Sequence, residues 1–107
     1  MNQSMFEIQA EFCKAMGNTA RLQLLHILRD NPLTVTEICR ETGLPQGTVS
    51  RQLTVLRRVG VVVSLRHGST KIYAITDHKI AEVCDLVHTI LVEQSTNTLN
   101  RLSKDNE

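Results

Sequence analysis

The chain has 107 residues, a formal net charge of +1, three cysteines and only three aromatic residues. This length suits one domain, residues 1–107, with a modest core of aliphatic side chains. No apolar run approaches the ~20 residues of a membrane span. The first residues carry acids where a signal peptide carries bases, so we expect a cytoplasmic protein without a membrane partner. An odd number of widely spaced cysteines argues against a disulfide framework.

The small net charge conceals an uneven distribution of charged residues along the chain. Residues 1–41 contain four bases and five acids, residues 42–76 contain five bases and no acid, and residues 77–107 contain three bases and six acids. A long segment whose only charges are positive is typical of a surface that meets phosphate. The middle third of the chain is therefore the candidate for binding a nucleic acid.

The sequence pattern in the first third of the chain predicts two helices. Residues 3–16 form the first, which ends at Gly17. Its apolar stripe consists of Met5, Ile8, Phe12 and Met16. Asn18 caps the second helix, which covers residues 19–30. The leucines expected to face inward there are Leu22, Leu25 and Leu28.

The next two helices have the spacing of a helix-turn-helix. Thr34 to Glu37 is a capping-box pattern that opens a short helix, and Gly43 ends it. Pro45 then opens a longer helix, at a position where its missing N–H costs nothing. The inward side chains of this helix are Val49, Leu53, Leu56 and Val59. Its outward face is polar and basic and comprises Gln46, Gly47, Thr48, Ser50, Arg51, Thr54, Arg57 and Arg58.

A β-hairpin and a last helix complete the chain. Residues 61–66 and 70–75 predict two strands joined by a glycine turn, which together look like a wing. Asp77 caps a final helix that runs to about residue 100, after which we expect a frayed end. The stripe of this helix contains Ile80, Val83, Cys84, Val87, Ile90 or Leu91, and Gln94. Because so small a domain cannot cover that stripe, we expect the first and last helices to form a two-fold dimer.

This order of elements, carried through GNTARLQLLHIL, LTVTEICRETGLPQGTVSRQLTVLRRVGVV and RHGSTKIYAI, resembles the ArsR/SmtB family of winged-helix transcriptional repressors over roughly residues 10–95. The expected fold is therefore mainly α with a small β-hairpin, a winged helix-turn-helix. The resemblance implies a homodimer that binds an operator in double-stranded DNA and releases it when an effector binds. No phosphate loop, activated nucleophile or catalytic carboxylate pair is evident, so we expect neither an enzyme nor a cofactor.

We expect DNA contacts from the outward face of the longer helix and from the wing. The expected DNA-binding residues are Gln46, Gly47, Thr48, Ser50, Arg51, Thr54, Arg57, Arg66, His67 and Lys71. Gln46, Ser50 and Arg51 should meet base edges. Thr54, Arg57 and Arg58 lie further back and should meet phosphate or solvent, and Arg58 could equally be a surface charge. The wing residues are either solvated charges or contacts with the minor groove and phosphate.

Three residues depart from the family pattern. Pro45 stands where members often have a capping serine. Gly47 replaces a polar side chain, although its bare backbone could approach a phosphate closely at the helix N-terminus. Arg51 replaces a common histidine and suits a bidentate contact with guanine.

The family's metal site is not expected here. Many members bind metal through Asp-x-His near the start of the last helix and His-x-x-His/Glu about three turns later. Asp77 and Glu93 fit that pattern, but Lys79 and Ile90 stand where histidines belong and are not metal ligands. Asp77 and His88 share a face of the helix, yet two ligands per chain make a weak site.

The three cysteines are compatible with a metal effector, a thiol-reactive effector or no effector. Thr34-Val35-Thr36 occupies the place of the Cys-x-Cys sensor of other members, and Cys39 falls on the inward face. Cys13 and Cys84 lie on helices expected at the dimer interface, so each is either a sensor or interface packing. His26 is expected to be a core-edge histidine. The alternative hypothesis for the whole chain is a protein-interaction dimer that has lost operator binding.

Overall fold

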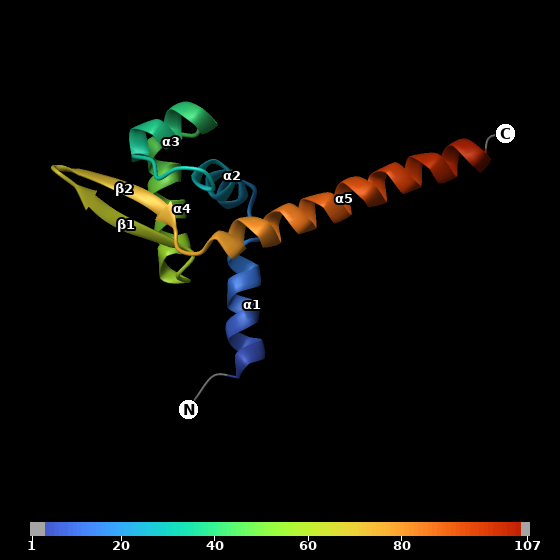
Figure 1. Ribbon diagram of the computed structural model, residues 1–107, viewed down its shortest axis with the longest axis horizontal. Helices are drawn as coiled ribbons and strands as arrows, with labels where there is room; N and C mark the ends of the chain where they lie inside the picture. Colours follow the sequence, from blue (N-terminus) through green and yellow to red (C-terminus); the bar gives the residue numbers. More distant parts are fainter. Residues whose placement is uncertain (1–3, 106–107) are drawn as a thin grey trace.

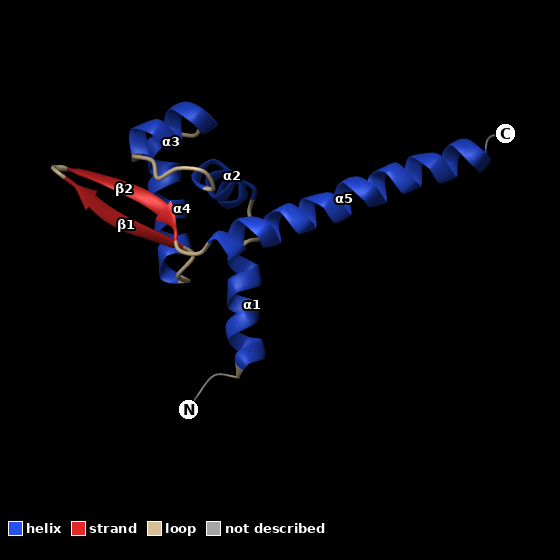
Figure 2. Ribbon diagram, in the orientation of Figure 1, coloured by secondary structure: helices blue, strands red, loops and turns tan. Residues whose placement is uncertain are grey.

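The computed structural model describes residues 4–105, with side chains as far as residue 103. These residues form helices and one antiparallel hairpin in the expected order (Figures 1 and 2), which confirms the predicted winged helix-turn-helix. The elements are α1 (Met5–Ala15), α2 (Thr19–Leu28), α3 (Val35–Thr42), α4 (Gln46–Arg58), β1 (Val62–His67), β2 (Thr70–Ile75) and α5 (His78–Asp105).

The hydrophobic core lies where α2, α3 and α4 meet the base of the hairpin. Its fully buried side chains are Leu24, Leu28, Ile38, Val49, Leu53, Leu56 and Val61. The inward stripe predicted for α4 is confirmed, with Val59 half-buried at its end. For α2 the prediction was wrong at one position, because Leu22 is 43% exposed and Leu24 is buried instead. α2 carries leucines on several sides, so spacing alone does not select its buried face.

Local hydrogen bonds explain why the helix-turn-helix begins and ends where it does. Thr34 Oγ1 accepts the N–H of Glu37 at 3.2 Å, and the Glu37 carboxylate accepts the N–H of Thr34 at 2.9 Å, which is the predicted capping box. Gly43 ends α3 with φ at 74°, a left-handed conformation that glycine adopts without a steric penalty. Pro45 then precedes α4 in an extended conformation, so two short helices are joined by a fixed turn.

The hairpin is anchored at its base and free at its tip. Its register runs from the Val62–Ile75 pair to the His67–Thr70 pair, next to the two-residue turn. Leu33, from the segment before α3, exchanges two backbone hydrogen bonds of 2.8 and 3.0 Å with Tyr73 of β2. These bonds attach the hairpin to the helix-turn-helix, so the wing is positioned by the same core that positions α4.

α1 and α5 extend away from the core as two arms (Figure 1). Ile80 and Ala81 anchor the start of α5 in the core, whereas Val83 and Val87 further along are about half exposed. The prediction of a frayed end was wrong for residues 100–105, which are helical. No glycine or proline follows residue 76, so the sequence contains no helix stop there. No described helix is long and apolar enough to cross a membrane.

Candidate nucleic-acid interface

The outward face of α4 is exposed and carries no acid. Val49, Leu53 and Leu56 pack into the core, which turns the polar side chains of the helix toward solvent. Gln46, Gly47, Ser50, Arg51, Thr54, Arg57 and Arg58 are exposed, and Thr48 is half-buried. This arrangement follows from the amphipathic period of the helix, since each buried residue is three or four positions from the next.

Arg51 lies back along α4 toward the first turn of the helix. Its Nη2 atom donates a hydrogen bond of 3.3 Å to the Thr48 hydroxyl. A Cβ atom added at Gly47 would lie 3.3 Å from Arg51 Nη1, so the guanidinium occupies the space that a side chain at position 47 would need. Thr54, one turn further on, donates its hydroxyl to the carbonyl oxygen of Ser50 at 2.9 Å.

The wing lies next to the C-terminal half of α4. A surface groove of about 540 Å³ separates them, lined by Thr54, Arg57 and Arg58 from α4 and by Val62, Val63 and Ser64 from β1. Near the tip, Arg66 and Lys71 face each other as a cross-strand pair, and His67 follows; all three are exposed. α4 and the hairpin therefore present the bases of residues 42–76 on adjoining exposed elements.

These bases are not neutralised within the part of the chain that the structure describes. There, Arg51, Arg57, Arg66 and Lys71 form no ion pair with a carboxylate. Ion pairs form instead at the end of α2 and in the first turns of α5. A hydrogen bond from the Lys79 backbone N–H holds the pKa of Asp77 below its usual value, and Lys79 Nζ lies 3.0 Å from Asp77 Oδ2. The positive charges of residues 42–76, which contain bases but no acid, are thus available to an external anion.

Two polar contacts between distant parts of the chain hold the helices in place. Arg21 Nη1 on α2 donates to Gln52 Oε1 on α4 at 2.9 Å. Arg29, which follows the last residue of α2, makes a bidentate ion pair with Asp85 on α5, including an Nη1–Oδ1 bond of 2.6 Å. The Arg29 hydrogen bonds hold the pKa of Asp85 below its usual value. Sequence reasoning missed both pairs, because their members are 31 and 56 residues apart and no spacing rule connects them.

The candidate effector residues lie on different elements. Cys13 on α1 is exposed, and Cys84 on α5 is half-buried. Burial raises the pKa of the Cys84 thiol, and the negative charge of Asp85 raises it further. Cys84 lines a cavity of about 810 Å³ between α2 and α5, whereas Cys13 does not. Cys39 is half-buried, in keeping with the inward face predicted for it.

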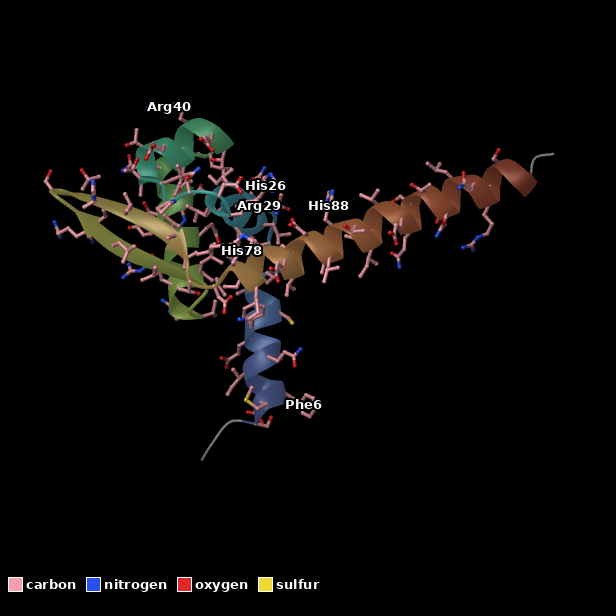
Figure 3. The ribbon with its side chains drawn as sticks, in the orientation of Figure 1. Phe6, His26, Arg29, Arg40, His78 and His88 are labelled. Atoms are coloured by element: carbon pink, nitrogen blue, oxygen red, sulfur yellow. The ribbon has the colours of Figure 1, made fainter. Side chains whose placement is uncertain are left out.

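The histidines are spread over α2, β1 and α5. Among those residues, no three His, Cys, Asp or Glu side chains are placed to hold a metal ion together. His26 is exposed, so its assignment as a core-edge histidine was wrong. It borders the α2–α5 cavity with His88, and Figure 3 labels both near Arg29, which lines the same cavity. α2 turns His26 outward because Leu24, Leu25 and Leu28 occupy its core face.

Comparison with known proteins identifies the family. The family described as bacterial regulatory protein, arsR family, matches residues 18–64. The chain is 34% identical over 91 residues to the uncharacterized HTH-type transcriptional regulator Rv0081 of Mycobacterium tuberculosis, covering 84% of this chain and 80% of that protein. It is 32% identical over 85 residues to the biofilm growth-associated repressor of Xylella fastidiosa, covering 79% of this chain and 75% of that protein.

Solved structures agree with the fold. The crystal structure of Rv0081 has a TM-score of 0.81 at 31% identity, covering 92% of this chain and 99% of that one. The homodimeric winged helix-turn-helix DNA-binding domain of Mb0332 from Mycobacterium bovis has a TM-score of 0.79 at 29% identity, covering 90% and 94% of the two chains. With its sequence and its fold in agreement, the chain belongs to the ArsR family of bacterial helix-turn-helix transcriptional regulators.

Proposed function

We propose that the chain is a homodimeric, sequence-specific DNA-binding repressor of transcription that acts in the cytoplasm. The observation that carries this proposal is the exposed, base-only surface formed by α4 and the wing, which the core and the Leu33–Tyr73 bridge hold in fixed relation. A helix presented beside a hairpin in this way suits insertion of the helix into a major groove, with the hairpin reaching the neighbouring backbone.

The position of each residue on this surface determines its proposed contact. Gln46, Ser50 and Arg51 lie in the first half of α4 and meet base edges, because the N-terminal part of a recognition helix enters the groove. Thr54 and Arg57 line the groove beside β1 and meet phosphate. Gly47 and Thr48, in the first turn of α4 beside Arg51, belong to the same proposed surface. At the wing, Arg66, His67 and Lys71 approach phosphate or the minor groove.

The dimer forms through the arms made by α1 and α5. Val83, Val87, Ile90 and Leu91 are each about half exposed on α5, and Phe6 is 83% exposed on α1. A contiguous apolar face of this size is costly to leave in water and is typical of an interaction site. The M. bovis relative is homodimeric. Two copies related by a two-fold axis then read two half-sites of one operator, with the whole chain acting as a single domain.

Release from the operator is assigned to an effector, either a thiol-reactive species or a metal. Cys13 on α1 and Cys84 on α5 are the candidate thiols, since both lie on the arms. Modification there would alter the relative placement of the two recognition helices. Mass spectrometry of the native protein before and after arsenite, zinc and a persulfide donor tests this part. Absence of any adduct would contradict an effector of either class.

DNA binding is tested by fluorescence anisotropy with a duplex from the chain's own promoter region and a scrambled duplex of the same composition. We expect preference for the promoter duplex and affinity that falls steeply with salt. Arg57→Ala should reduce the salt slope by about two per dimer while keeping sequence preference, whereas Arg51→Ala should reduce the preference itself. Equal affinity for both duplexes would refute specific recognition and favour a protein-interaction dimer. A promoter reporter that loses expression when the chain is deleted would make it an activator.

A further inference from the structure

The first turn of α4 contains a contact that the proposed function does not yet explain. Arg51 is exposed, and an exposed arginine ordinarily samples many rotamers in solvent. Here its guanidinium lies over the first turn, with Nη2 3.3 Å from Thr48 Oγ1 and Nη1 beside the bare backbone of Gly47. Two positions of the first turn, Gly47 and Thr48, thus contact the guanidinium of Arg51 in this orientation.

Glycine favours this orientation because of space. A Cβ atom at position 47 would lie 3.3 Å from Arg51 Nη1, which is tighter than an ordinary van der Waals contact. An alanine there would require the guanidinium to shift by a few tenths of an ångström. Gly47 lies within the helix and has no left-handed backbone conformation, so its backbone gives no reason for glycine there. In a helix, glycine is otherwise the less favourable choice relative to alanine.

The hydrogen bond to Thr48 leaves the rest of the guanidinium available. Arginine has five N–H donors, and the bond to Thr48 uses one of those on Nη2. The remaining Nη1 and Nη2 hydrogens form the planar fork that matches the O6 and N7 acceptors of guanine. A side chain already held in position loses less conformational entropy when it binds, which favours the correct base.

We propose that Gly47 and Thr48 are positioning residues for Arg51, Gly47 by leaving room for its guanidinium and Thr48 by holding one nitrogen, so that Arg51 is oriented to read guanine. This inference rests on the proposed DNA-binding function and deepens it. Under this inference Gly47 affects sequence specificity through Arg51. The backbone of Gly47 then has no need to approach phosphate directly.

The test begins with a duplex that the wild-type protein selects from a randomised library. Each guanine of that duplex is replaced in turn by 7-deazaguanine, which lacks the N7 acceptor. At the guanine that Arg51 reads, we expect wild-type affinity to fall about 3- to 10-fold, as for the loss of one hydrogen bond. Arg51→Ala should remove this discrimination, whereas Arg57→Ala, a control on the same helix, should retain it.

Gly47→Ala and Thr48→Val are then expected to reduce the same discrimination, and Thr48→Ser to preserve it. Gly47→Ala should melt at or above the wild-type temperature, because its Cβ meets only the end of a flexible side chain. The decisive comparison is a double-mutant cycle. In the Arg51→Ala background, Gly47→Ala should have no further effect on affinity.

Two outcomes would overturn the inference while leaving the proposed function intact. One is unchanged discrimination in both Gly47→Ala and Thr48→Val. The other is a loss of affinity in Gly47→Ala that is equal for all duplexes and persists in the Arg51→Ala background, which would mean that position 47 contacts DNA directly. A wild-type protein that selects no sequence from the library would instead refute the proposed function, and this inference with it.

Discussion

Val87, near the middle of the exposed apolar face of α5, offers a quantitative test of the proposed dimer. The residue is 51% exposed, and the partly exposed Val83 and Leu91 lie one turn before and after it on the same face. Val87→Ala removes two methyl groups and leaves the helix intact, because alanine is the residue that helices accept best. We therefore expect a folded protein with a weaker dimer.

The size of the effect follows from the exposed fraction. Each buried methyl or methylene group contributes about 0.8 kcal/mol, so the two methyl groups would contribute about 1.6 kcal/mol if association buried them completely. Val87 is already about half-buried within one chain, so association adds about half of that, or about 0.8 kcal/mol per copy. The two-fold axis doubles this to about 1.6 kcal/mol, which corresponds to a dimer dissociation constant about 15-fold higher.

Sedimentation equilibrium over a dilution series measures this constant. Val92→Ala is the matched control, because Val92 is also a valine on α5 and also 51% exposed. It lies five residues further on, about 140° around the helix from Val87. We expect Val92→Ala to dimerise like wild type and Val87→Asp to be largely monomeric, since it places a carboxylate in the interface. Equal shifts for the two alanine variants, or a wild-type constant for Val87→Asp, would refute this interface.

Three further predictions concern stability and reactivity. Asp85→Asn should lower the free energy of unfolding at neutral pH, because the Arg29 ion pair holds the pKa of Asp85 below its usual value. The stabilisation from the charged Asp85 is complete above the ordinary aspartate pKa of about 3.9 and is lost as the pH falls through the lowered pKa of the folded state. In urea unfolding, the stability difference between Asp85→Asn and wild type should therefore vanish in strong acid. A difference that stays constant with pH would contradict this prediction. Thr34→Ala should cost about 1 kcal/mol by removing the hydroxyl that caps α3, and Thr34→Ser should restore most of it, as denaturant midpoints would show. The Cys84 thiol should react with iodoacetamide more slowly than free cysteine at neutral pH, because burial raises its pKa and leaves less thiolate; an equal rate would argue against that burial.

Most of the fold was predictable because its signals are local. The Thr34 capping box, the turn at Gly43 and the hairpin turn at Gly68 each act through backbone groups within a few residues, so sequence spacing reveals them. The observed β1 begins and ends one residue later than the predicted strand, and β2 has the predicted bounds. Errors arose at Leu22 and His26 on α2, which are exposed, because the leucines of this helix lie on several sides and spacing alone does not select its buried face.

The sequence by itself determined which residues form the charged surface, because the absence of acids from residues 42–76 and the helical period of α4 are both properties of the chain order. Only the tertiary structure decided how those residues are placed. The Leu33–Tyr73 bridge brings the wing beside α4, and the Arg29–Asp85 pair joins α2 to α5. Such contacts depend on how the core packs, which no local pattern encodes. The orientation of Arg51 over Gly47 differs from these contacts, because it depends on neighbours three and four residues away on the same outward face of α4.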